Sequence, residues 1–180
     1  MNAPSSTALQ ETEAAVSAPG GDQRLSAAEI DASCRWPLLL LFTSGVLWLV
    51  FGTILALIAA IKLHKADFLA DCPWLTLGRV RPASMNSFLY GFASQVGFGV
   101  ALWLMCRLGG VKLIFQWPLL VAWKLWNIGV TVGVLAILAG ASTGFEWLEM
   151  PRAAAGILFV AYAIMGICVV ATFTMRRQRE

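Results

Sequence analysis

The sequence predicts an all-α membrane protein with four transmembrane helices, both termini in the cytoplasm and a disordered tail before the first helix. Hydrophobic residues make up 59% of the chain and charged residues 13%, with a mean hydropathy of +0.75. A soluble domain cannot bury so much apolar surface. A helix needs about 20 apolar residues to cross a bilayer. Uncharged runs of this length occur at residues 36–61, 83–106, 125–145 and 153–175.

The first 34 residues differ in composition from the rest of the chain. They are rich in Ala, Ser, Gly and carboxylates and contain few large apolar side chains. Such a segment cannot offset the entropy lost on ordering, so residues 1–34 are predicted to be a disordered tail. The apolar run starts only at Trp36. The first helix is therefore expected to be an uncleaved signal anchor, and residues 35–180 a four-helix transmembrane domain.

The third span is expected to start before its uncharged run, near Trp117 and Pro118. Lys124 would then lie inside the span and extend its ammonium group back towards the lipid headgroups. The four spans are predicted at residues 36–61, 84–106, 117–142 and 153–175.

Lys and Arg residues are divided unequally between the two sides of the predicted bundle. Cytoplasmic loops carry the excess of these residues, so the larger group marks the cytoplasmic side and places both termini there. The net charge of +3 follows from this asymmetry and calls for no nucleic-acid partner. The larger group is Arg24, Arg35, Arg107, Lys112, Lys124, Arg176, Arg177 and Arg179, and the smaller is Lys62, Lys65, Arg79, Arg81 and Arg152.

Small and polar residues indicate how the helices associate. Helix contacts in lipid depend on small residues that allow close approach and on interhelical hydrogen bonds. Gly129 and Gly133 form a GxxxG motif on the third span. We prefer helix contact over a substrate path as the role of these residues. The second span carries a small, polar stripe of Ser84, Ser87, Gly91 and Ser94, and polar groups at membrane depth are Asn86, Gln95 and Asn127.

The chain is too poor in histidine to build a multi-histidine metal site by itself. It has one histidine and four cysteines, which excludes a self-contained copper site, a multi-histidine zinc site and a bis-histidine haem. His64 is expected to be a solvated residue at the outer interface. The cysteines show no CxxC spacing and are expected to be free thiols with packing roles, at Cys34, Cys72, Cys106 and Cys168.

Two loop motifs resemble a known family. The sequence W-L-T-L-G-R-V-R-P-A-S-M-N at residues 74–86 is similar to W-L-x-F-G-R-x-R-P-x-H-x-N in catalytic subunit I of cbb-type (C-family) haem-copper cytochrome c oxidases. The sequence G-F-E-W-L-E-M-P at residues 144–151 is similar to G-x-E-Y-x-E-x-P of the same subunit. The resemblance covers about residues 30–180 and implies the first four of twelve helices, as a truncated or split subunit.

The resemblance implies a haem b site, which this sequence alters. In the family, a histidine at the position of Ser84 is an axial ligand of the low-spin haem, and serine is a poor ligand for haem iron. Met85 is adjacent, but its helical position turns it off the Ser84 stripe, so it is expected to pack rather than to coordinate. The resemblance places Arg79 and Arg81 over the haem propionates. The alternative is that these arginines reach lipid headgroups or hold the loop.

The second motif implies a cation site at the outer loops. In the family an acidic residue of this loop helps to hold a cation such as calcium near the propionates, and Glu149 is the better counterpart, with Glu146 as a second candidate. The alternative is that these carboxylates pair with Arg79, Arg81 or Arg152.

The resemblance implies a membrane subunit of a respiratory electron-transfer complex in the bacterial cytoplasmic (inner) membrane. We expect a structural role, completed by a chain with the remaining subunit I helices and by cytochrome c subunits, and no catalysis by this chain alone. Contact with that chain is expected through the Ser84/Gly91 and Gly129/Gly133 faces. In a second, catalytic version of this hypothesis the complex keeps its haem, and a neighbouring residue of this chain or a partner histidine replaces the lost ligand. The other class of function is a membrane scaffold or assembly factor without a redox role.

Overall fold

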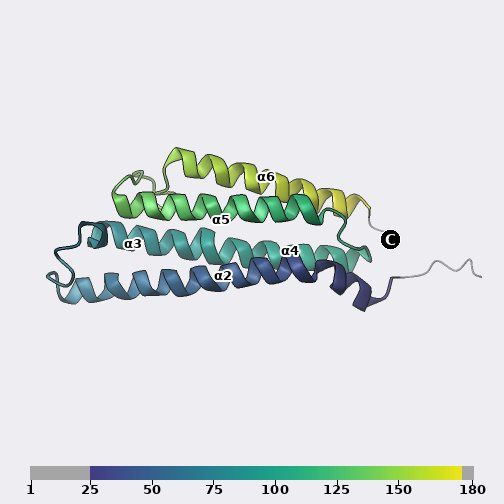
Figure 1. The fold of residues 1–180 in the computed structure, drawn as a ribbon, viewed down its shortest axis with the longest axis horizontal. Coiled ribbons are helices and arrows are strands. Elements are labelled where there is room, and N and C mark those ends of the chain that lie inside the picture. Colours follow the sequence, from purple (N-terminus) through teal and green to yellow (C-terminus); the bar gives the residue numbers. More distant parts are fainter. Residues whose placement is uncertain (1–24, 176–180) are drawn as a thin grey trace, which may run out of the picture.

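The computed structural model describes residues 25–175 as an elongated bundle of helices that share one long axis (Figure 1). Within this part of the chain all regular structure is helical. The second crossing is one continuous helix made of α3, a π-helical turn η2 and α4. The elements are α2 (Ala27–His64), the short 3-10 helix η1 (Pro73–Leu75), α3 (Leu77–Asn86), η2 (Ser87–Ala93), α4 (Ser94–Gly109), α5 (Gln116–Ala139) and α6 (Arg152–Thr174).

Four helices of the described chain are long and apolar enough to cross a membrane, as the sequence predicts. The start of α2 and the end of α6 lie at the same end of the bundle, as four crossings require (Figure 1). The assignment of that end to the cytoplasm remains a prediction. The four helices are Ala27–His64, Leu77–Gly109, Gln116–Ala139 and Arg152–Thr174.

The first helix starts inside the segment that was expected to be disordered. Ser26 and Glu29 form a capping box in which each side chain bonds the other residue's backbone, which fixes the helix start at Ala27. Ile30 and Cys34 are buried in the core, and Asp31 pairs with Arg107 of α4. The capping box and these contacts explain why residues 27–34 are helical, although their hydrophobicity does not predict a helix. The remaining tail, residues 1–24, lies outside the described residues, as do Arg176, Arg177 and Arg179.

The second helix also starts earlier than residue 84, because α3 begins at Leu77 and carries Pro82 within it. Residues 77–86 of the first motif therefore all lie on a helix, and not only residues 84–86 as predicted. The third helix ends at Ala139, before the predicted residue 142, because Gly140 adopts a left-handed backbone with φ +96°. Both motifs lie at one end of the bundle, where α3 begins and α5 ends (Figure 1).

The small residues bring the helices of this chain together. A Cβ at Gly91 would lie 2.6 Å from Trp48 Cβ of α2, and a Cβ at Gly133 would lie 2.5 Å from Met150 Sδ. Gly129 is covered by Leu158 of α6. The expectation that the Ser84/Gly91 and Gly129/Gly133 faces contact another chain is therefore wrong, because this bundle itself occupies them.

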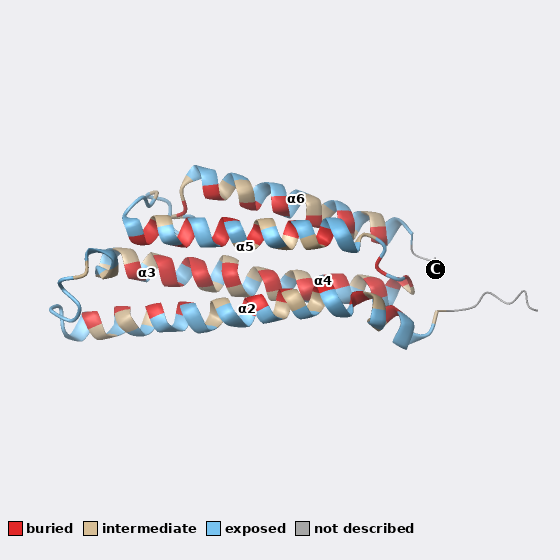
Figure 2. Ribbon diagram, in the orientation of Figure 1, coloured by how far each residue is buried: buried red, intermediate tan, exposed pale blue. Residues whose placement is uncertain are grey.

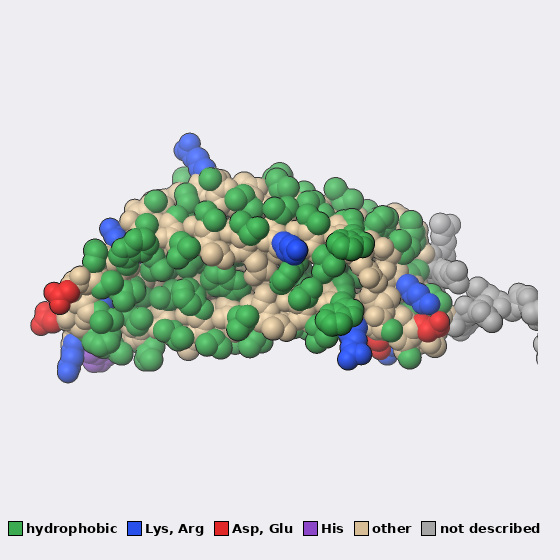
Figure 3. Space-filling model, viewed as in Figure 1, with side chains coloured by type: hydrophobic (Ala, Val, Ile, Leu, Met, Phe, Trp, Pro, Cys, Tyr) green, Lys and Arg blue, Asp and Glu red, His purple; other side chains and the backbone are tan. Residues whose placement is uncertain are grey.

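Buried residues form stripes that face the inside of the bundle, while the outer faces are exposed (Figure 2). The visible outer surface is largely hydrophobic, and most of its charged side chains gather at the two ends (Figure 3). This distribution matches a bundle surrounded by lipid.

Candidate functional site

Four of the six predicted site residues line one groove at the loop end of the bundle. Arg81 and Met85 come from α3, while Glu146 and Glu149 come from the segment between α5 and α6. The groove has a volume of about 530 Å³. We call it the loop groove. It combines a guanidinium group, a thioether and two carboxylates from sequence positions more than 60 residues apart.

A hydrogen bond between Asn86 and Glu149 joins the two motifs. Asn86 Nδ2 donates to Glu149 Oε2 at 2.5 Å and to the backbone oxygen of Pro82 at 2.8 Å. Asn86 is buried, and its Oδ1 atom has no hydrogen-bond partner among the described residues. The site therefore contains one buried oxygen that is free to accept a bond.

The loop that carries the carboxylates is held by hydrogen bonds to its backbone oxygens. The backbone nitrogen of Thr143 donates to the backbone oxygen of Glu149 at 2.8 Å, and the Thr143 hydroxyl donates to the backbone oxygen of Leu148 at 2.6 Å. Tyr90 of η2 donates its hydroxyl to the oxygen of Trp147 at 2.9 Å. These bonds fix the loop to the second crossing and keep Glu149 beside Asn86.

Arg79 points away from the loop groove and holds backbone instead. Its Nη1 donates to the oxygens of Pro73 at 2.8 Å and Leu138 at 3.3 Å. The guanidinium lies against Gly140, where a Cβ would be 2.7 Å from Nη2. A cation at the carboxyl end of α5 is favoured by the helix dipole. This geometry matches the loop-holding alternative for Arg79 and leaves Arg81 as the arginine of the groove.

The residues present do not fit an axial haem ligand on this helix. Ser84 is 3% exposed, and its hydroxyl donates to the oxygen of Arg81 at 2.7 Å. Its stripe packs on α2, where a Cβ at Gly52 would lie 3.2 Å from Ser87 Cβ. Met85 is 40% exposed and lies in the loop groove, away from this stripe. Neither side chain therefore provides a buried donor beside space for a porphyrin.

The carboxylates do not form a large acidic cluster either. Within the described chain, no group of three or more His, Cys, Asp or Glu side chains comes together. Calcium binds carboxylate oxygens, so Glu146 and Glu149, which both line the loop groove, are the side chains that could hold it here. His64 is exposed. The cysteines are free thiols, of which Cys34, Cys106 and Cys168 are buried and Cys72 is half-buried.

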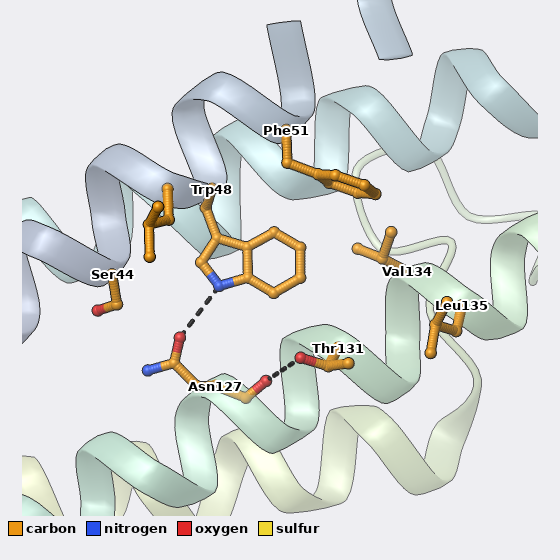
Figure 4. Close-up of a pocket in the computed structure, with 8 residues that line it drawn as sticks. Ser44, Trp48, Phe51, Asn127, Thr131, Val134 and Leu135 are labelled. Carbon is orange, nitrogen blue, oxygen red and sulfur yellow. Dashed lines mark hydrogen bonds between the residues drawn. The ribbon is translucent and has the colours of Figure 1, made fainter. Parts of the chain in front are cut away.

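A polar network lies in the middle of the bundle. The amides of Gln95 and Asn127 bond each other at 3.2 and 3.3 Å. Trp48 Nε1 donates to Asn127 Oδ1 at 3.0 Å (Figure 4). Trp123 Nε1 donates to Ser44 Oγ at 2.9 Å. The network links α2, α4 and α5, which confirms the role of Gln95 and Asn127 in helix contact.

A cavity of about 420 Å³ opens beside this network, between α2 and α5 (Figure 4). Sequence reasoning does not find it, because its walls come from two helices that are not consecutive in the chain. The i, i+4 spacing of exposed residues on both helices is the signal that could have indicated it. Its walls include Ser44, Leu47, Trp48 and Phe51 of α2 and Asn127, Thr131, Val134 and Leu135 of α5.

The four apolar crossings define a multi-pass membrane protein, and the Ser84 hydroxyl on its second helix bonds the backbone of that same helix. Residues 37–180 match the family model described as cytochrome c and quinol oxidase polypeptide I, so the chain belongs to this family. This match confirms the predicted resemblance to subunit I and relates the protein to the haem-copper oxidases.

A curated relative supports the same family. The protein described as cytochrome c oxidase subunit 1 homolog, from Azorhizobium caulinodans, is 22% identical over 108 residues. The matched region is 58% of this chain and 19% of that relative. The chain therefore matches about one fifth of the relative's length.

Proposed function

We propose that this chain is a structural membrane subunit of a respiratory terminal oxidase complex in the bacterial cytoplasmic membrane, with both termini in the cytoplasm. It corresponds to the first four helices of subunit I. The remaining helices, on a partner chain, and cytochrome c subunits complete the complex. The metal ligands belong to those other helices, and this chain supports one side of the assembly.

The proposal rests on one combined observation: the two loop motifs are still in contact, but the family's haem-ligand position is occupied by a serine. The Asn86–Glu149 bond holds the two motifs together, while Ser84 has only a buried hydroxyl bonded to its own helix. A subunit that retained haem ligation would need a donor at this stripe. A subunit that only packs beside a partner chain needs the loop contacts and the helix packing, but no haem ligand.

The loop groove supports two further parts of the proposal. Arg81 is exposed in the groove, and its planar guanidinium suits a carboxylate such as a propionate of a haem held by other helices. Asn86 Oδ1 is buried without a partner among the described residues, next to the carboxylate of Glu149. We propose a calcium ion at this place, with Glu146 as the second carboxylate.

Gentle purification of the tagged full chain from its native membrane tests the proposal. We expect co-purification of a chain with the remaining subunit I helices and of haem absorbance in the same fraction. The haem content should be unchanged by Ser84→Ala or Met85→Ala, because these residues are not ligands. A colourless chain with no subunit I partner would contradict the proposal.

A scaffold or assembly factor is the second candidate. It is favoured by the Gly91 and Gly129/Gly133 faces, which are occupied within this chain, so that the bundle packs without a partner. Deletion of the gene separates the two candidates. Less assembled oxidase, with normal turnover per assembled enzyme, indicates an assembly factor. Assembled oxidase with altered turnover indicates an integral subunit.

A further inference from the structure

We propose that the groove between α2 and α5 receives one transmembrane helix of a partner chain, and that this helix carries a carboxylate that pairs with Lys124. The inference rests on the proposed function, because it names the surface through which the chain joins its complex. We call this surface the α2/α5 groove. It comprises the cavity of about 420 Å³ and the exposed stripe of α5 that continues from it to Lys124.

Lys124 lies on the same stripe as the α5 wall of the cavity. At roughly 100° per residue, Lys124 is about 20° around the helix from Thr131, and seven residues separate them, or about 10 Å along the axis. Both side chains are exposed, as are Val121, Ile128 and Leu135. These five residues repeat at intervals of three and four, the spacing with which one helix packs along another.

Lys124 is also deep in the predicted span. Trp123 bonds Ser44, which places this turn of α5 beside the turn of α2 that holds Ser44. Ser44 is eight residues from Trp36, so this level is about 12 Å inside the predicted span. A lysine side chain extends about half that distance along the helix, and a charge left in hydrocarbon is costly.

The ammonium group has no acidic partner within the described residues. The ion pairs found there are Arg107 with Asp31 and Lys112 with Glu29, both at the opposite end from the loop groove. The four predicted spans contain no Asp or Glu. A second copy of the chain could therefore offer no carboxylate at this depth, and its own Lys124 would repel the first. Charge complementarity requires a different chain.

The cavity beside Lys124 is suited to the apolar side chains of a packed helix. Its polar groups are already engaged, since Asn127 Oδ1 accepts from Trp48 and Asn127 Nδ2 donates to Gln95 and the backbone of Trp123. Large apolar side chains of a partner would fill it, given that a cavity of about 150 Å³ already accepts benzene. The α2/α5 groove therefore combines an apolar cavity with the Lys124 ammonium. An apolar helix with one acidic residue matches both features.

Photocrosslinking in the native membrane tests the proposal. The full chain carries p-benzoylphenylalanine at Thr131 in the groove or, as a matched control, at exposed Phe159 on α6. We expect the Thr131 adduct to map to a transmembrane helix of another chain, with Asp or Glu within about three turns of the adduct. The Phe159 variant should not give this adduct. Adducts from Thr131 only to lipid, or only to a second copy, would overturn the proposal.

Charge exchange supplies the second arm. Lys124→Glu should lower the yield of the Thr131 adduct by about tenfold or more, because a paired carboxylate would then face a like charge. Lys124→Arg should retain the yield, which checks that substitution here does not unfold the chain. Changing the mapped acidic residue to Lys should restore the yield with Lys124→Glu. An unchanged yield with Lys124→Glu, or no rescue, would overturn the proposal.

The outcomes separate this inference from the proposed function. If the oxidase partner co-purifies but Thr131 reaches only lipid, the complex exists and the α2/α5 groove is not its interface. If Thr131 reaches an acidic helix of a chain unrelated to an oxidase, the groove is a docking surface and the proposed function fails.

Discussion

Asn86 donates a hydrogen bond of 2.5 Å to Glu149, a residue 63 positions later in the chain. This bond connects the helical end of the first motif with the loop of the second. Asn86 is buried, so the carboxylate satisfies an amide that would otherwise lack one of its partners. The bond therefore fixes the distance between the two motifs, on which the shape of the loop groove depends.

Removal of either partner should destabilise the fold through the same interaction. We expect Asn86→Ala and Glu149→Ala each to lower the free energy of unfolding in detergent by about 1–3 kcal/mol. The double variant should lose less than the sum of the two, since the interaction is shared. Measured in a calcium chelator, exposed Glu146→Ala serves as the control and should change little. Strictly additive losses in chemical unfolding would show that the bond is not formed.

Calcium should stabilise the chain if it binds at the loop groove. With calcium at ten times its dissociation constant, binding adds about 1.4 kcal/mol to the free energy of unfolding. We expect a higher midpoint of thermal unfolding in calcium than in a chelator, and the same midpoint in both for Glu149→Ala. Magnesium at equal concentration is the ion control. A wild-type midpoint that is insensitive to calcium would exclude the site.

The close approach at Gly91 gives a prediction on packing. A Cβ there would lie 2.6 Å from Trp48 Cβ, which cannot move without the backbone of α2. Gly91→Ala should therefore cost about 1–3 kcal/mol of unfolding free energy. Gly97→Ala is the matched control on the same helix, because nothing lies within 4 Å of its added Cβ. Equal unfolding midpoints for the two variants would contradict this packing.

The sequence predicts the four crossings because each one is a long uncharged run, and the structure confirms them. It misplaces their ends, which depend on local contacts. The capping box of Ser26 and Glu29 extends α2, and the left-handed Gly140 stops α5. Hydrophobicity contains no information about either contact.

For the site, the sequence could place the candidate residues in two loops but not relative to each other. Arg79 and Arg81 are two residues apart and look equivalent in the motif. Their helical positions differ by roughly 200°, so Arg79 reaches the oxygen of Leu138 while Arg81 lines the groove. Which direction faces α5 is decided by tertiary packing, and that could not be predicted from one chain.

The polar network in the middle of the bundle gives the last prediction. Asn127 bonds Trp48 and Gln95, so Asn127→Leu would leave the Gln95 amide and the Trp48 N–H without these partners. Hydrogen bonds between membrane helices average about 0.6 kcal/mol each, so we expect a loss of about 1–2 kcal/mol in unfolding free energy. Thr131→Val is the control, because the Thr131 hydroxyl donates only to the backbone of Asn127 on its own helix.

The same variant should change the fluorescence of the chain. The indole N–H of Trp48 loses its acceptor in Asn127→Leu, and the cavity beside it gains an apolar side chain. We expect a shift of the tryptophan emission that Thr131→Val does not produce, with Trp48→Phe as the assignment control. If Asn127→Leu unfolds at the wild-type midpoint with unchanged emission, the network does not join α2 to α5. The α2/α5 groove would then lack the fixed wall that a partner helix needs.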